Sequence, residues 1–214
     1  MTIWLLVSVF LVLLLINVPV AFAIGIASAL AALTLTRTDP TFIVQRMIVG
    51  INSFPLLAII FFILAGNLLG RGGVARRLVN LAEVIVGRIP GGLAQINILA
   101  SMFFGGVSGS CVADVSSIGA LLIPAMVKDG YSKEYSAAVT LTSATMGPII
   151  PPSIPMIVYG HVAGTVSIAG LFLAGAVPGV MIGLGQMVIV YFQALRRHYK
   201  KCPPIPFKEA VWRV

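Results

Sequence analysis

Two short segments carry the residue types from which a buried cation site can be built. Residues 105–110 read Gly-Gly-Val-Ser-Gly-Ser, and residues 147–153 read Gly-Pro-Ile-Ile-Pro-Pro-Ser. Glycine and proline interrupt helical hydrogen bonding, so each segment leaves backbone carbonyl and amide groups without helical partners. Carbonyl and hydroxyl oxygens are the ligands that hard cations prefer. The two segments together predict a site for an alkali cation.

The candidate residues fall into two groups by expected role. Those expected to surround the cation, through hydroxyl or backbone oxygens, are Ser108, Gly109, Ser110, Thr145, Gly147 and Pro148. Those expected to line the adjoining cavity are Asp114, Pro151, Pro152 and Ser153. Each hydroxyl has an alternative use, because a serine or threonine near a helix often bonds to the backbone of its own turn.

Asp114 is the one formal charge between Leu93 and Val127. Burying an ionised carboxylate at a helix centre in a membrane costs at least about 2.5 to 3.5 kcal/mol without a partner. It follows Ser110 by one turn, so it can hold the tip of the break through hydrogen bonds to backbone amides, which is the favoured role. The alternative is that it adds negative charge to the cation site.

The surrounding composition is that of a protein embedded in lipid. The chain has 214 residues, of which 59% are hydrophobic and 9% charged, and its mean hydropathy is +1.07. Formal charges are absent from residues 1–36, 47–70 and 135–195. Each stretch reaches the roughly 20 residues that span a hydrocarbon core. A soluble enzyme is excluded, and the net charge of +8 reports topology, not a nucleic-acid partner.

The pattern of breaks predicts an all-α, multi-span helical bundle. We expect two short helices within residues 1–36, an interfacial helix at 41–51, a span at 54–69 and an amphipathic basic connection at 71–88. Residues 93–127 are expected to form a re-entrant helical hairpin with arms about half a span long, because a break at membrane depth must line a protein-buried cavity. Residues 135–162 form a broken helix, 163–195 the last span, and 196–214 a basic tail.

The distribution of basic residues supports the hairpin. If residues 93–127 return to the side from which they start, then residues 71–88, 128–134 and 196–214 all share one side of the membrane. These three segments hold twelve of the fourteen Lys and Arg residues. The positive-inside rule then places them in the cytoplasm.

At residues 105–115 and 147–154 the sequence resembles the large membrane subunit of tripartite ATP-independent periplasmic (TRAP) transporters. Residues 123–126, Gly130-Tyr131 and the helix around 137–140 share the likeness, which covers the whole chain. The resemblance implies sodium-driven uptake of an organic acid across the bacterial inner membrane, with no organic cofactor. It also implies two partners: a small membrane subunit and a periplasmic binding protein.

The resemblance further implies an elevator-type transporter in which residues 1–92 are scaffold and residues 93–162 belong to the moving transport domain. The family's large subunit has a second half in inverted topology, so this chain is expected to be the N-terminal half and to need the C-terminal half for transport. The substrate, whether C4-dicarboxylate, sialic acid or a sugar or keto acid, is not determined by the sequence.

A second interpretation is an intramembrane serine protease. Gly106-Val107-Ser108-Gly109 fits the Gly-x-Ser-Gly pattern of rhomboids, with His161 as the base. That interpretation leaves Asp114 and the break at 147–153 without a role. We therefore expect a transporter and not an enzyme.

Overall fold

The chain is described by a computed structural model that covers residues 2–35, 39–197, 199 and 202. The described part is entirely helical and contains no strand. It divides into two compact units, residues 1–54 and 55–214. The predicted division into a scaffold (1–92) and a transport domain (93–162) concerns movement, and it stays a prediction.

The first unit contains the two short helices expected before residue 36. Helices α1 (Thr2–Leu15) and α2 (Val20–Leu35) are joined by a tight turn in which Asn17 has φ 68° and Pro19 precedes α2. Ala23, Ala27 and Ala31 lie one turn apart on α2 and are buried. Small side chains at this spacing let two helices pack closely. Helix α3 (Pro40–Ile51) completes the unit and confirms the helix expected at 41–51.

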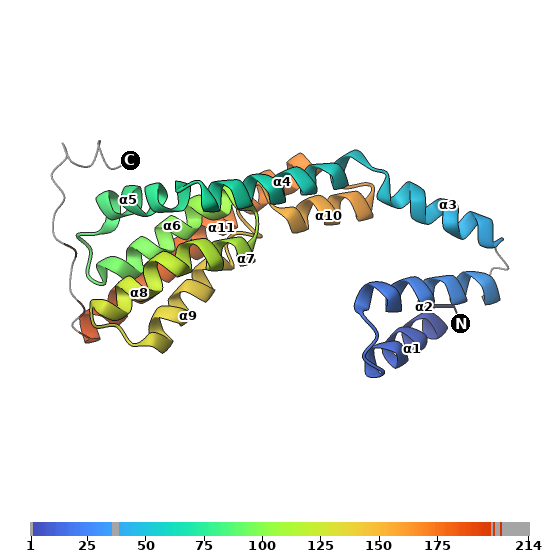
Figure 1. The fold of residues 1–214 in the computed structure, drawn as a ribbon, viewed down its shortest axis with the longest axis horizontal. Coiled ribbons are helices and arrows are strands. Elements are labelled where there is room, and N and C mark those ends of the chain that lie inside the picture. Colours follow the sequence, from blue (N-terminus) through green and yellow to red (C-terminus); the bar gives the residue numbers. More distant parts are fainter. Residues whose placement is uncertain (1, 36–38, 198, 200–201, 203–214) are drawn as a thin grey trace. The chain divides into compact units, whose positions relative to one another are not determined.

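The second unit contains the remaining helices (Figure 1). They are α4 (Phe54–Arg71), α5 (Val74–Val86), α6 (Gly92–Ser108), α7 (Cys111–Asp114), the π-helix η1 (Val115–Gly119), α8 (Ala120–Lys128), α9 (Lys133–Ala144), α10 (Ile154–Ala163) and α11 (Ile168–Arg197).

Helices α6 to α8 form the predicted hairpin. The chain runs out along α6, turns at Gly109 and Ser110, and returns along α7, η1 and α8, so that both bases lie at the same end (Figure 1). The expectation of half-span arms was wrong. The arms contain 17 and 18 residues, or about 26 Å each at 1.5 Å per residue. The first arm is longer because Gly105 and Gly106 remain helical, and the break is confined to Gly109 and Ser110.

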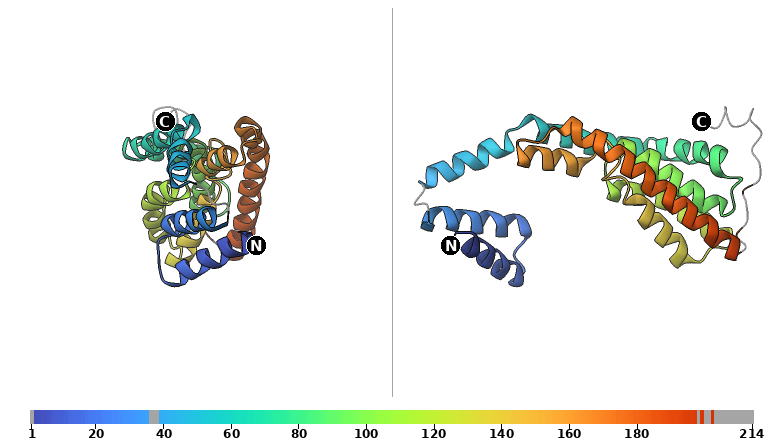
Figure 2. Two further views of the ribbon diagram at one scale, coloured as in Figure 1. Left: turned by 90° about the vertical axis from the view of Figure 1, so that its right-hand side faces the viewer. Right: turned by 180° about the vertical axis from the view of Figure 1, so that it is seen from behind.

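Residues 135–162 are interrupted as predicted. Helix α9 ends at Ala144, residues 145–153 form turns, and α10 begins at Ile154. Proline at 148, 151, 152 and 155 lacks the amide hydrogen that a continuous helix needs. The long α11 packs along α6 on the far side of the hairpin (Figure 2, right).

Helix α5 joins the core through one face. Its residues Ala75, Ala82 and Val86 are buried against Phe104 of α6 and Ile118 of η1. The basic residues of α5 lie on its other faces, so the predicted amphipathic helix is confirmed. A second buried cluster joins the two arms of the hairpin to α9: Ala94, Ile98, Met126, Val139 and Met146.

Among the residues that the structure describes, two helical elements are long and apolar enough to cross a membrane: Cys111–Lys128 and α11 (Ile168–Arg197). Helix α3 with residues 54–70 of α4 gives a third if they count as one span. Many large apolar side chains are exposed on α1, α4 and α11. Lipid or other membrane segments are the environment that such surfaces require. Of the predicted basic tail at 196–214, most residues lie outside the described part of the chain.

Candidate functional site

The two helix breaks lie against each other, although Gly109 of the first and Gly147 of the second are 38 positions apart in sequence. A Cβ atom added to Gly105 would lie 2.9 Å from the Cα atom of Gly147, and one added to Gly147 would lie 3.3 Å from the carbonyl carbon of Ser110. A Cβ atom added to Gly109 would lie 2.5 Å from the carbonyl oxygen of Pro152. Glycine at these positions is what allows the two backbones to come so close.

The hairpin tip is held by its own two serines. Gly109 ends α6 in the left-handed region at φ 60°, and its N–H donates to the carbonyl of Gly105. The Ser110 hydroxyl caps α7 by accepting the N–H of Ala113 at 3.4 Å. The Ser108 hydroxyl, which is buried, lies 3.4 Å from the N–H of Ser110 and 3.5 Å from its carbonyl oxygen. The tip therefore begins a new helix within two residues of ending the previous one.

The second break is closed by Ser153. Its buried hydroxyl donates to the carbonyl of Pro148 at 2.5 Å and accepts the N–H of Met156 at 3.3 Å, which caps α10. The Thr145 hydroxyl donates to the carbonyl of Thr142 at 2.7 Å, and its side chain is exposed. Both hydroxyls thus make the local backbone bonds that the sequence allowed as their alternative use.

A cavity of about 310 Å³ opens beside the tip of the hairpin. Ser108 and Ser110 line it from the hairpin, Gly66 and Asn67 from α4, and Ile154 from α10. Gly147, Pro148, Pro151 and Pro152 are not among its lining residues, although the backbone of the second break touches the tip from the opposite side. Two hydroxyl groups and the serine-capped N-termini of α7 and α10 therefore lie beside a space large enough for an ion or a small solute.

Asp114 is completely buried on the second arm. Neither of its carboxyl oxygens has a hydrogen bond of good geometry in the described part of the chain, although the Ser101 side chain of α6 interacts with the carboxyl group. The favoured role, holding the tip through bonds to backbone amides, was wrong: Ser110 caps those amides with its own hydroxyl. Asp114 is thus a buried acidic group close to the polar network of α6 and α9, and its contribution to a cation site stays a prediction.

One polar network was missed at the sequence level. The Asn97 amide donates to Thr140 Oγ1 at 2.7 Å, the Ser143 hydroxyl donates to Asn97 Oδ1 at 3.1 Å, and Ser101 and Ser143 pair at 3.1 Å. These four residues are buried and tie α6 to α9. The spacing of these residues could have indicated the network. Asn97 and Ser101 lie one turn apart, as do Thr140 and Ser143, so each pair places polar side chains on one face of an otherwise apolar segment.

The protease interpretation receives no support from the geometry. The Ser108 hydroxyl interacts with the backbone of Ser110, and no hydrogen bond joins it to His161 within the described residues. A nucleophilic serine needs a base within hydrogen-bond reach.

Comparison with known proteins agrees with the fold. Residues 7–212 match the family model described as "Tripartite ATP-independent periplasmic transporter, DctM component". The chain is 46% identical over 192 residues to the protein YgiK of Salmonella typhimurium, covering 89% of this chain and 44% of that protein. It is 44% identical to the isethionate TRAP transporter permease protein DctMQ of Oleidesulfovibrio alaskensis, covering 87% of this chain and 29% of that protein.

A third relative is the sialic acid TRAP transporter large permease protein SiaM of Vibrio cholerae, 41% identical over 194 residues, which are 90% of this chain and 45% of that protein. The chain thus spans less than half the length of each of these relatives. The family match extends over nearly the whole of this chain. On these grounds the chain belongs to the DctM family of TRAP transporter large permeases, which are transporters and not enzymes.

Proposed function

We propose that this chain forms the part of a TRAP permease that couples sodium entry to the import of an organic acid. The observation that carries the proposal is the meeting of two helix breaks, at Gly109 and Ser110 and at residues 145–153. Interrupted helices that meet inside a transporter supply carbonyl oxygens for a cation and helix N-termini for an anion. The ends of α7 and α10, capped by Ser110 and Ser153, have this arrangement.

The relatives and the site both support an organic anion as the substrate. The names of two relatives specify isethionate and sialic acid, which are both organic anions. Backbone amides at the starts of α7 and α10 favour an anion, while the oxygens of the tip favour a cation. A sodium ion bound at the tip would therefore also offset the negative charge of the substrate.

The proposed assembly includes a small membrane subunit and a periplasmic binding protein, as the tripartite family name indicates. We place it in the inner membrane of a bacterium. Because the chain spans less than half of YgiK and of SiaM, we propose that transport also requires the remaining portion that those relatives contain.

The test is sodium-dependent uptake of a radiolabelled organic acid by the complete transporter in proteoliposomes. Gly147→Leu should abolish uptake, because a side chain there must enter the contact with Ser110 and Cys111, whose backbone atoms lie 3.3 to 3.4 Å from the Cβ position. Gly185→Leu is the matched control, since a Cβ at Gly185 meets nothing within 4 Å. Uptake that proceeds equally well without a sodium gradient would refute the coupling.

A further inference from the structure

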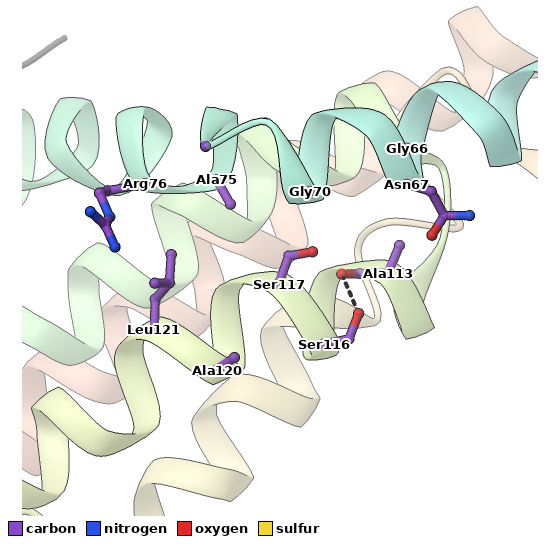
Figure 3. A pocket seen from close by; sticks show the side chains of 11 residues that line it. Gly66, Asn67, Gly70, Ala75, Arg76, Ala113, Ser116, Ser117, Ala120 and Leu121 are labelled. Atoms are coloured by element: carbon purple, nitrogen blue, oxygen red, sulfur yellow. Dashed lines mark hydrogen bonds between the residues drawn. The ribbon is translucent and has the colours of Figure 1, made fainter.

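A second cavity, of about 530 Å³, lies between α4–α5 and the second arm of the hairpin (Figure 3). Gly66, Gly70 and Ala75 form one wall, and Ala113, Ala120 and Leu121 the other. Its polar side chains are Asn67, Arg76, Ser116 and Ser117. None of its eleven lining residues is acidic.

Arg76 is placed differently from most of the other basic residues of this unit. Arg88, Lys128, Lys133 and Arg197 lie at or near helix ends at the base of the hairpin. Arg76 instead lies opposite Leu121, in the middle of the second arm, and its side chain extends toward that arm (Figure 3). The Arg76 side chain is accessible to solvent and lines the cavity, so its guanidinium can meet an anion that enters there.

The polar groups around Arg76 have unused hydrogen-bond donors. Within the described residues, no ion pair or hydrogen bond engages the Arg76 guanidinium, the Asn67 amide or the Ser117 hydroxyl. The Ser116 hydroxyl alone is occupied, donating to the carbonyl of Ala113 at 3.0 Å (Figure 3). Guanidinium and amide groups together are a donor set suited to the two or three oxygens of a carboxylate or sulfonate.

The local backbone keeps the cavity open. A Cβ atom added to Gly70 would lie 2.7 Å from the hydroxyl oxygen of Ser117. A larger residue at position 70 would therefore displace this hydroxyl. Ser116 and Ser117 lie in the π-helix η1, a wide turn of a kind that often occurs at functional sites. Gly66, Asn67, Ala113 and Ser116 line this cavity and also the cavity at the hairpin tip, so the two cavities are neighbours.

We infer that Arg76, Asn67 and Ser117 form a binding subsite for the acidic group, carboxylate or sulfonate, of the transported organic anion. The subsite rests on the proposed function, and it gives the anion a position separate from the cation at the tip. The volume of about 530 Å³ lies within the range of small-molecule sites. Arg76 supplies the positive charge that attracts the acidic group of the anion, while Asn67 and Ser117 orient the oxygens of that group.

The test uses the charge of a cysteine reagent as a probe, which requires no knowledge of the substrate. In the full chain in phosphatidylcholine nanodiscs, Cys111 and Cys202 are first replaced by serine, and Ser117→Cys is introduced. The rates of reaction with an anionic (sulfonatoethyl) and a cationic (trimethylammonioethyl) methanethiosulfonate are then compared. Ala120→Cys, which lies next to η1 on the same arm and also lines the cavity, is the second reporter in case Ser117→Cys does not fold.

We expect the anionic reagent to react faster, and Arg76→Gln to reduce its advantage by about tenfold or more, the effect of removing one charge a few ångströms away. Arg77→Gln is the matched control, because Arg77 neighbours Arg76 on α5 but does not line the cavity. Equal rates for both reagents, or equal effects of the two arginine variants, would overturn the subsite.

Occupancy by substrate is tested by protection of the same cysteine. Succinate, isethionate and N-acetylneuraminate are each added before the reagent, with succinamide as the uncharged comparison. Slowing by at least one anion but not by succinamide supports the subsite, and slowing by none of them overturns it. The labelling and the protection measurements are both made without sodium. If the complete transporter proves independent of sodium, the proposed sodium coupling is refuted, but the labelling and protection results for the subsite still hold.

Discussion

At the scale of single residues, three glycines determine how closely the two breaks approach. Gly105 and Gly147 face each other across the contact, and Gly109 combines a positive φ with a position against the carbonyl of Pro152. An added methyl group has a different cost at each. At Gly109 it is opposed both by the backbone conformation and by a 2.5 Å contact, whereas at Gly147 the nearest atoms are 3.3 Å away.

We therefore predict a graded loss of stability in the order Gly109→Ala, Gly105→Ala, Gly147→Ala, from largest to smallest. The first should cost about 2 kcal/mol or more, because strain at a positive φ adds to the clash. The measurement is the unfolding free energy of the chain in detergent micelles.

Gly185→Ala is the control for that series. Gly185 lies within α11 with open space around it, and replacing a helical glycine by alanine stabilises by about 0.5 to 1 kcal/mol. Equal effects for Gly109→Ala and Gly185→Ala would contradict the close contact of the breaks.

Tyr131 provides a second prediction at this scale. The side chain lies in the loop between α8 and α9, stacked on Tyr199 with 4.0 Å between ring centroids, and its hydroxyl has no hydrogen-bond partner among the described residues. Burial, assisted by the charge of Asp129, raises the pKa of Tyr131 well above its usual value of 10. The folded state therefore keeps a proton that the unfolded state loses.

The unfolding free energy should accordingly be unaffected by this group below pH 10 and fall above it, by up to about 1.4 kcal/mol per pH unit. Tyr131→Phe should match the parent chain at pH 7, because no hydrogen bond is lost, and should be less sensitive to alkali. Urea unfolding at pH 7 and pH 11 measures both effects. An equal alkaline loss in parent and variant would show that Tyr131 keeps its usual acidity.

At the scale of helices, the network of Asn97, Ser101, Thr140 and Ser143 joins the first arm of the hairpin to α9. The two breaks follow directly after these helices, at Gly109 and at Thr145. Polar bonds buried between two helices fix their axial register, because a shift by one turn leaves donors and acceptors unpaired. The network therefore aligns the two breaks at the same level.

A double-mutant cycle on Asn97→Ala and Ser143→Ala tests this role. Each single variant should lose about 1 to 3 kcal/mol of unfolding free energy, since it leaves a buried partner unsatisfied. The double variant should lose less than the sum, with a coupling of roughly 0.6 to 2 kcal/mol.

The control cycle pairs Asn97→Ala with Thr142→Ala. Thr142 lies on α9, next to Ser143, but its side chain is exposed, and its hydroxyl donates to the backbone of its own turn. These two changes should be additive. Additivity in the Asn97 and Ser143 cycle would mean that the network does not align α6 with α9.

At the scale of the second unit, the basic helix ends gather at the base of the hairpin. Tyr199 stacks on Tyr131, and the N–H of Cys202 donates to the carbonyl of Gly87 at 3.0 Å, so the chain after α11 contacts both the loop before α9 and the end of α5. This arrangement agrees with the topology expected from the positive-inside rule, in which these segments share the cytoplasmic side.

The topology prediction is that Lys133 is cytoplasmic and Thr165, in the loop between α10 and α11, is outside. In a background with Cys111 and Cys202 replaced by serine, Lys133→Cys should react with an impermeant maleimide only after the cells are permeabilised. Thr165→Cys should react in intact cells and serves as the positive control. Reaction of Lys133→Cys in intact cells would mean that the hairpin crosses the membrane and is not re-entrant.

The sequence by itself determined the helices, the two breaks and the family, because these depend on local properties. Glycine and proline interrupt helices wherever they occur, and long apolar stretches require lipid, so the hairpin and the broken helix could be predicted from residue order alone. The end of the first arm could not be predicted in the same way, since Gly105 and Gly106 tolerate a helix as well as a break, and packing against residues 147–151 keeps them helical.

Only the tertiary structure decided what lies beside what. It brings Gly105 against Gly147, buries Asp114 completely on the second arm, and places Arg76 of the basic helix α5 opposite the middle of that arm. No local rule contains these facts, because each depends on how two distant helices pack. The free energy of such a contact depends on which side chains fill the space between helices, and the order of residues along one helix does not specify its neighbour.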